Sequence, residues 1–93
     1  FTRVVAQAQA QSVSVVPHGC GVYGYYMAMA FDYINLAEFV MMSERADKIE
    51  PNFGTMFTNE PLPEAGYITL PETAGFGLEL NRDALNLVRP YTH

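Results

Sequence analysis

The sequence predicts an α/β fold, and the alternation of helix and strand patterns in its first half is the reason. Residues 1–11 and 21–33 have helical patterns, whereas residues 13–16 and 36–42 are short apolar runs typical of buried strands. Two neighbouring parallel strands covered by helices form part of a larger sheet. Alone they would expose strand edges and a broad apolar face. We therefore expect a C-terminal piece of a longer protein.

The first helix and the first strand make up the opening unit. Alanines favour a helix over residues 1–11, where Val4, Val5 and Ala8 share one face. Residues 13–16 then read Val-Ser-Val-Val and run into Pro-His-Gly, a pattern that predicts a buried strand ending in a loop. The carboxyl ends of such strands are where active sites lie in α/β sheets and barrels.

The second unit repeats this order. Residues 21–33 are apolar nearly all round, which predicts a helix packed between layers, although their first half could instead be an aromatic loop that lines a pocket. Asn35 ends the pattern, and residues 36–42 follow as the second strand. Alternation along this strand places Leu36 and Glu38 on the same face.

The second half of the chain is different in kind. Proline and glycine are frequent in residues 50–63, so we expect an extended and irregular path there. Short strands are expected at residues 66–70 and 78–80, and a short helix at residues 81–87. We accordingly divide the chain into residues 1–50, which hold the helix–strand units, and residues 51–93, a tail that wraps over another body.

Composition excludes several classes of protein. The chain has 93 residues, enough for one domain at most, and ten acidic against five basic residues give a formal charge of −5. Without a Lys/Arg cluster, a nucleic-acid surface is not expected. The longest apolar tract is too short to span a bilayer, so no membrane segment is expected. The single cysteine, Cys20, cannot form an internal disulfide, and we expect it to be a small buried thiol in a reducing compartment.

Two side chains at the strand ends are candidates for catalysis. His18 follows the first strand, and an imidazole there can act as a general acid or base, while Gly19 would let the backbone approach a ligand. Glu38 lies in the second strand, where a carboxyl group could stabilise a developing oxyanion. Structural alternatives remain: His18 as a loop histidine bonded to a carbonyl, and Glu38 as a loop cap or an arginine's partner.

Several motifs together resemble the mandelate racemase subgroup of the enolase superfamily, and in particular its sugar-acid dehydratases. The passage Val15-Val16-Pro17-His18-Gly19 resembles the family's seventh-strand region, and Glu38 stands where the family has a glutamate on the eighth strand. The more specific part is the closing segment, which includes Asn59-Glu60-Pro61-Leu62-Pro63, Gly66-Tyr67-Ile68-Thr69-Leu70-Pro71 and Gly75-Phe76-Gly77-Leu78-Glu79-Leu80.

The resemblance implies a fold and a reaction. The chain would be the C-terminal portion of a modified (β/α) TIM-type barrel, with a tail that packs toward an α+β capping domain. The reaction would remove the proton α to a sugar-acid carboxylate, with L-rhamnonate as the expected substrate. The enediolate would be stabilised on Mg²⁺, and the β-hydroxyl would leave as water to give a 2-keto-3-deoxy acid. His18 would move the proton, Glu38 would hydrogen-bond the substrate carboxylate, and Gly19 would help to bind the substrate.

The resemblance also implies partners. The Mg²⁺ ligands and the acid that orients His18 would precede Phe1, so the chain itself would hold no metal and would be inactive alone. The whole enzyme would be a cytoplasmic homo-oligomer. Two alternatives stay open: another acid-sugar dehydratase or racemase of the same subgroup, and a non-catalytic packing or binding fragment in which His18 and Glu38 are structural.

Overall fold

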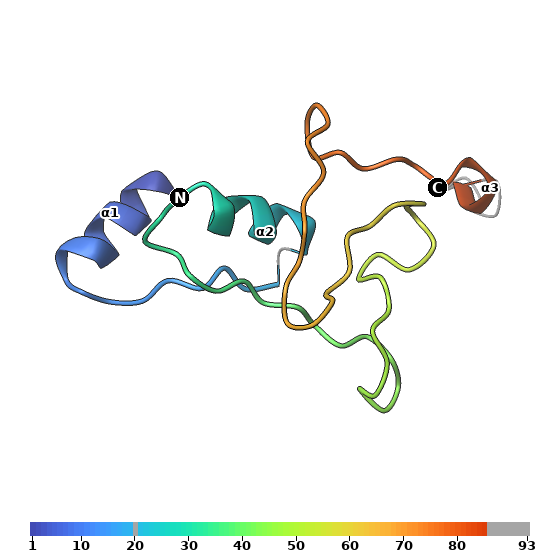
Figure 1. The fold of residues 1–93 in the computed structure, drawn as a ribbon, viewed down its shortest axis with the longest axis horizontal. Coiled ribbons are helices and arrows are strands. Elements are labelled where there is room, and N and C mark those ends of the chain that lie inside the picture. Colours follow the sequence, from blue (N-terminus) through green and yellow to red (C-terminus); the bar gives the residue numbers. More distant parts are fainter. Residues whose placement is uncertain (20, 86–93) are drawn as a thin grey trace, which may run out of the picture. The chain divides into compact units, whose positions relative to one another are not determined.

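A computed structural model describes residues 1–19 and 21–85 (Figure 1). The chain divides into two compact units. The first unit is Phe1–Val40 and the second is Met41–His93. The sequence instead predicts a division after residue 50 between a barrel part and a tail, and this division stays a prediction. Cys20, expected as a buried thiol, and His93, expected at a solvated terminus, lie outside the described residues.

The first helix, α1, spans Thr2–Ala10 and confirms the helix predicted at residues 1–11. It ends in a Schellman motif, in which the N–H of Ser12 donates to Gln9 O at 3.1 Å and the N–H of Val13 donates to Ala8 O at 2.9 Å. Ser12 adopts a φ of 55°, a conformation that glycine usually supplies at this position. The motif fixes the direction in which the chain leaves the helix.

The second helix, α2, spans Val22–Met29 and begins after the glycines, as predicted. It ends four residues before the predicted end at Tyr33, because the chain reverses in a turn closed by Ile34 N–H and Phe31 O at 2.9 Å. The alternative of an aromatic loop in its first half is not adopted. The ring of Phe31 meets that of Phe1 edge to face at 5.6 Å, which joins the end of α2 to the start of α1.

The four predicted strands are wrong for this chain: within the described residues, segments 13–16, 36–42, 66–70 and 78–80 form no regular strand. The described residues contain only two isolated antiparallel bridges, Phe57 to Leu80 and Glu64 to Tyr67. Two short parallel segments bury too little surface to maintain a ladder by themselves, since strands need several neighbours and a covered face. These segments therefore have strand propensity but form no regular ladder in the described part of the chain.

The first bridge of the second unit brings two distant segments together. Thr58 N–H donates to Glu79 O at 3.0 Å, and Asn81 N–H donates to Met56 O at 2.8 Å. The side chain of Asn59 extends this pairing, because its amide donates to Gly77 O and its oxygen accepts from Glu79 N–H, both at 2.7 Å.

The second bridge closes a two-residue turn. Ala65 and Gly66 both have positive φ, 51° and 81°, and the backbones of Glu64 and Tyr67 exchange both hydrogen bonds across them. Positive φ at both central residues is the mark of a type I′ turn. A short helix, α3, follows at Arg82–Leu85 within the predicted range 81–87, whose last two residues lie outside the described part of the chain.

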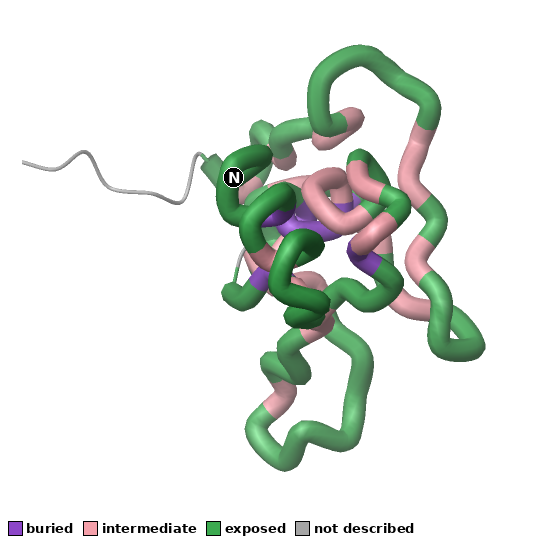
Figure 2. The backbone as a smooth tube through the Cα atoms, turned by 90° about the vertical axis from the view of Figure 1, so that its left-hand side faces the viewer, coloured by how far each residue is buried: buried purple, intermediate pink, exposed green. Residues whose placement is uncertain are grey.

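The buried core is small (Figure 2). In the first unit it consists mainly of Val5 from α1, Val22 and Tyr25 from α2, and Ile34 from the turn that follows. The buried polar residue of the second unit is Glu60. None of the helices among residues 1–19 and 21–85 has the length and apolar character needed to cross a bilayer.

Candidate active site

The structure brings His18 and Glu38 into direct contact. Nδ1 of His18 lies 2.6 Å from Oε2 of Glu38, and the backbone N–H of Gly19 donates to the same oxygen at 3.3 Å. The His18 side chain is 86% exposed, whereas that of Glu38 is 31% exposed. The three residues selected from the sequence therefore form one cluster, and Glu38 pairs with an imidazole rather than with an arginine.

The contact specifies which imidazole nitrogen would act. Gly19 N–H can only donate, so Oε2 of Glu38 accepts that bond. When Oε2 carries no proton of its own, it also accepts from His18, and Nδ1 then carries the hydrogen of that bond. In neutral His18 the lone pair consequently lies on Nε2, which makes Nε2 the atom that can take up a proton.

Local structure explains why the cluster forms. Pro17 is buried and carries no N–H, so it anchors the chain immediately before His18. Gly19 has a φ of 66°, the left-handed conformation that glycine adopts without strain, and its N–H donates to Glu38. The Pro-His-Gly sequence thus presents the imidazole and the backbone donor on the same side.

Tyr33 was not selected from the sequence, yet it joins the segments that carry the cluster. Its hydroxyl donates to the backbone oxygen of Val13 at 2.8 Å. In the sequence Tyr33 looks like the end of an apolar helix. Only its spacing of twenty residues from Val13, the same as the spacing between His18 and Glu38, could have marked it.

Glu60 is the second functional group that sequence reasoning missed. It is only 8% exposed, and its two oxygens accept from Asn52 N–H at 2.7 Å and Phe53 N–H at 3.1 Å. A buried carboxylate normally needs such partners. Among scattered acidic residues nothing distinguished it except its place between Asn59 and Pro61 in the closing segment.

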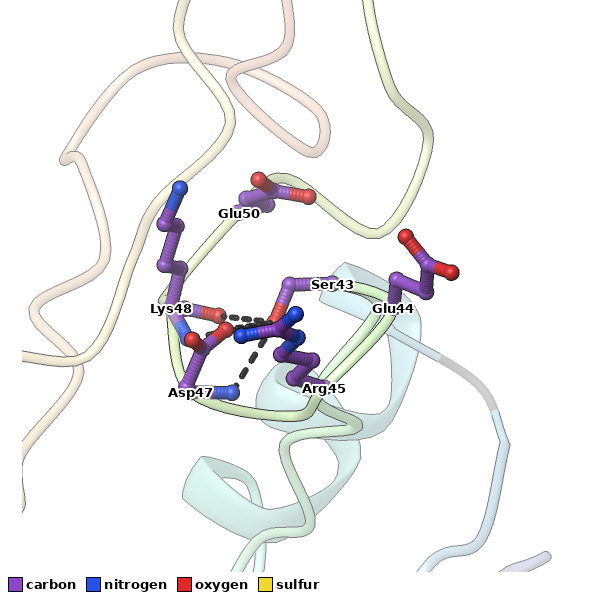
Figure 3. A pocket seen from close by; sticks show the side chains of 6 residues that line it. All are labelled: Ser43, Glu44, Arg45, Asp47, Lys48 and Glu50. Carbon is purple, nitrogen blue, oxygen red and sulfur yellow. Dashed lines mark hydrogen bonds between the residues drawn. The ribbon is translucent and has the colours of Figure 1, made fainter.

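An open hollow of about 400 Å³ lies in the second unit (Figure 3). Its lining residues are Ser43, Glu44, Arg45, Asp47, Lys48 and Glu50. Ser43 Oγ accepts from the N–H groups of Asp47 and Lys48, each at 3.1 Å, so the serine organises the loop rather than facing a ligand. Acidic and basic groups are mixed around the hollow, which therefore selects for neither charge.

Residues 1–19 and 21–85 do not gather three or more His, Cys, Asp or Glu side chains in a way that could hold a metal ion. Mg²⁺ prefers six oxygen ligands in an octahedron. One imidazole and one carboxyl group, already bonded to each other, do not fit that requirement.

Comparison with known proteins defines the class. Residues 1–84 match the sequence model of the enolase C-terminal domain-like family, and the chain belongs to this family. It is 40% identical over 91 residues to the L-rhamnonate dehydratase of Saccharopolyspora erythraea, which covers 98% of this chain and 23% of that protein. It is also 40% identical over 89 residues to the putative L-rhamnonate dehydratase of Caldivirga maquilingensis, covering 96% and 22% of the two chains.

A solved structure agrees with these relatives. The chain resembles the crystal structure of L-rhamnonate dehydratase from Gibberella zeae with a TM-score of 0.78 and 36% identity, over 89% of this chain and 22% of that one. The resemblance to the enolase superfamily that the motifs indicated is thus confirmed. The chain spans less than a quarter of the length of these relatives.

Proposed function

We propose that this chain is the C-terminal part of a Mg²⁺-dependent hydro-lyase that dehydrates L-rhamnonate to a 2-keto-3-deoxy acid. The observation that carries the proposal is the contact between His18 and Glu38, in a chain 40% identical to an L-rhamnonate dehydratase over nearly its whole length. A general base and a carboxyl group side by side could supply a proton acceptor and a hydrogen-bond donor to the charge that develops on the substrate carboxylate.

The fold we propose for the whole protein is a modified (β/α) TIM-type barrel with an α+β capping domain. Residues 1–50 would supply the last helix–strand units, and residues 51–93 the tail that returns to the cap. Exposed apolar side chains support this assignment, since Val13 is 56% and Leu36 is 67% exposed in the chain by itself. Neighbouring strands of a barrel would cover such side chains and complete the ladders.

His18 is the proposed base. The bond between carbon α and its proton breaks, and the proton moves to Nε2. The β-hydroxyl then takes a proton from Nε2 and leaves as water, and the remaining enol becomes the keto acid. Each proton taken by His18 is thus returned, and the imidazole ends the cycle neutral.

Glu38 would interact with both the base and the substrate. With Oε2 accepting from His18 and Gly19, a proton on Oε1 could be donated to the substrate carboxylate as negative charge develops there. Glu38 thus makes the contact with His18 that the resemblance assigns to an acid preceding Phe1, and the same side chain would stabilise the product of proton removal. The proposed substrate-binding role of Gly19 follows from its position beside this pair.

The ligands of the metal would lie elsewhere in the whole protein. We assign these ligands to the segment that would precede Phe1, as the resemblance to the family implies. When bound, Mg²⁺ would supply Lewis-acid polarisation of the substrate carboxylate. We also propose a homo-oligomer in the cytoplasm, a reducing compartment that suits the single cysteine.

The test is deuterium exchange at carbon α of L-rhamnonate by the whole protein with Mg²⁺. His18→Asn should lower the exchange rate by about 10²–10⁴-fold, the usual contribution of a general base. His93→Asn, which removes the other of the two histidines, is the matched control and should keep the rate. Exchange that survives His18→Asn would show that His18 is not the base.

Two further measurements separate the alternatives. Mg²⁺ and sugar acid should together raise the melting temperature of the whole protein, whereas a non-catalytic packing or binding fragment would not respond. A panel of acid sugars would reveal another dehydratase or a racemase of the same subgroup. The 93-residue chain alone should show no turnover with L-rhamnonate and Mg²⁺.

A further inference from the structure

The cluster of His18, Gly19 and Glu38 offers two positions at which one further proton can bind. Oε2 of Glu38 faces two donors, Nδ1 of His18 at 2.6 Å and the N–H of Gly19 at 3.3 Å. When Oε2 accepts both hydrogen bonds, a proton bound by the carboxyl group must lie on Oε1. Nδ1 already carries a hydrogen in this arrangement, so a further proton on the imidazole must lie on Nε2.

These two positions are the atoms that meet the substrate in the proposed function. Nε2 of His18 would take the α-proton, and Oε1 of Glu38 would donate to the substrate carboxylate. Catalysis therefore needs Nε2 without a proton and Oε1 with one. Moving a single proton from Nε2 to Oε1 converts an ion pair of imidazolium and carboxylate into this neutral pair, and the total charge of the two side chains is zero in both forms.

Without substrate, a single proton would lie on the wrong atom for catalysis. An imidazole ordinarily binds a proton about 100-fold more tightly than a glutamate carboxylate does. On these ordinary affinities the proton lies on Nε2 of His18, where it blocks the lone pair of the base. A productive complex therefore needs something that reverses the order of the two proton affinities.

The carboxylate of the substrate can supply this reversal. Placed within hydrogen-bond distance of Oε1, it would face an ionised Glu38 as a like charge and would exclude water from that oxygen. A neighbouring like charge and the loss of water both favour a neutral carboxyl group, and such effects can strengthen its proton binding by about 1,000-fold or more. This exceeds the preference of about 100-fold for the imidazole.

We propose that the carboxylate of the substrate shifts one proton from Nε2 of His18 to Oε1 of Glu38, so that binding of an anionic sugar acid creates the base. The N–H bond at Nε2 breaks, an O–H bond forms at Oε1, and water carries the proton between them. The proton returns to Nε2 when the product leaves. This inference rests on the proposed function and adds that an uncharged analogue cannot generate the base.

The test is ¹⁵N NMR of the whole protein with labelled histidine and Mg²⁺ at about pH 6, between the ordinary pKa values of a carboxyl group and an imidazole. The His18 signals are assigned by their loss in His18→Asn. The probe is the analogue of L-rhamnonate without the β-hydroxyl, which cannot lose water. On its addition, the Nε2 signal should move from that of a protonated to that of an unprotonated ring nitrogen, whereas the signals of His93, the other histidine, should not move.

Two controls isolate the cause. L-rhamnitol, which has CH₂OH in place of the carboxylate, should leave the proton on Nε2. Glu38→Gln keeps the shape of the side chain but offers an amide that does not take up the proton, so Nε2 should stay protonated with the anionic analogue. The expected loss of the proton is the opposite of simple electrostatics, because a nearby anion ordinarily favours a charged imidazolium.

Three outcomes would overturn the inference: an Nε2 that is unprotonated before the analogue is added, an Nε2 that stays protonated in its complex, and a loss of the proton that occurs equally in Glu38→Gln. The proposed function fails by a separate result, which is α-proton exchange that survives both His18→Asn and Glu38→Gln. If both substitutions stop exchange while Nε2 keeps its proton in the complex, only the present inference is wrong.

Discussion

Replacing Glu60 by glutamine tests how the second unit is held together. The carboxylate is buried, and each of its oxygens accepts one backbone N–H, from Asn52 and from Phe53. A glutamine has the same shape but only one acceptor oxygen. Its NH₂ group must face one of the two N–H donors, so one hydrogen bond is lost and a donor opposes a donor.

The magnitude follows from these contacts. The bond to Asn52 is the shorter, 2.7 Å against 3.1 Å, so we expect the glutamine oxygen to keep it and the Phe53 bond to be lost. Hydrogen bonds to charged groups contribute about 1.5–3 kcal/mol. Because 1.4 kcal/mol corresponds to tenfold, opening at Phe53 should become roughly 10- to 150-fold more frequent.

The assay is amide hydrogen exchange at Phe53 in Glu60→Gln. Glu64→Gln, the same chemical change at an exposed carboxylate of this unit, is the control and should leave Phe53 unchanged. If exchange at Phe53 were the same in Glu60→Gln as in the parent protein, the buried carboxylate would not be what orders residues 52–60.

Two further substitutions test the pairing of the second unit. Gly77→Ala should destabilise it by more than Gly54→Ala, which costs about 1–2 kcal/mol through positive φ alone. A Cβ at Gly77 would lie 2.5 Å from Thr73 Oγ1, whereas Gly54 faces open space. Thermal unfolding of both variants checks this. Asn59→Asp should keep the Glu79 amide protected but lose the donor to Gly77 O, at a cost of about 1–3 kcal/mol, whereas Asn59→Ala should also expose the Glu79 amide to exchange.

The helices were predictable because their signals are local. Alanines and a continuous apolar pattern sufficed to locate α1 and the start of α2. The end of α2 was not predictable in the same way. Its apolar pattern continues to Tyr33, but the turn at residues 31–34 buries Ile34 and brings Phe31 onto Phe1. That packing depends on the tertiary structure rather than on the local pattern.

The strands were not predictable, because they depend on neighbours that a local pattern does not reveal. Residues 13–16 and 36–42 have strand propensity, but propensity becomes a ladder only where neighbouring strands are present. The candidate site was nevertheless predictable in part, since His18, Gly19 and Glu38 were selected and the structure brings them together. Tyr33 and Glu60 were missed because their partners are backbone groups seven to twenty residues away, and no local pattern marks those.

Both units use the same physical solution where sheet neighbours are lacking. Backbone donors and acceptors need partners, and here polar side chains supply several of them. Tyr33 bonds a carbonyl and Glu38 an amide in the first unit, while Asn59 and Glu60 bond four backbone groups in the second. Each of these side chains ties two segments at one register, so substitutions that remove one of them should loosen the segments that it joins.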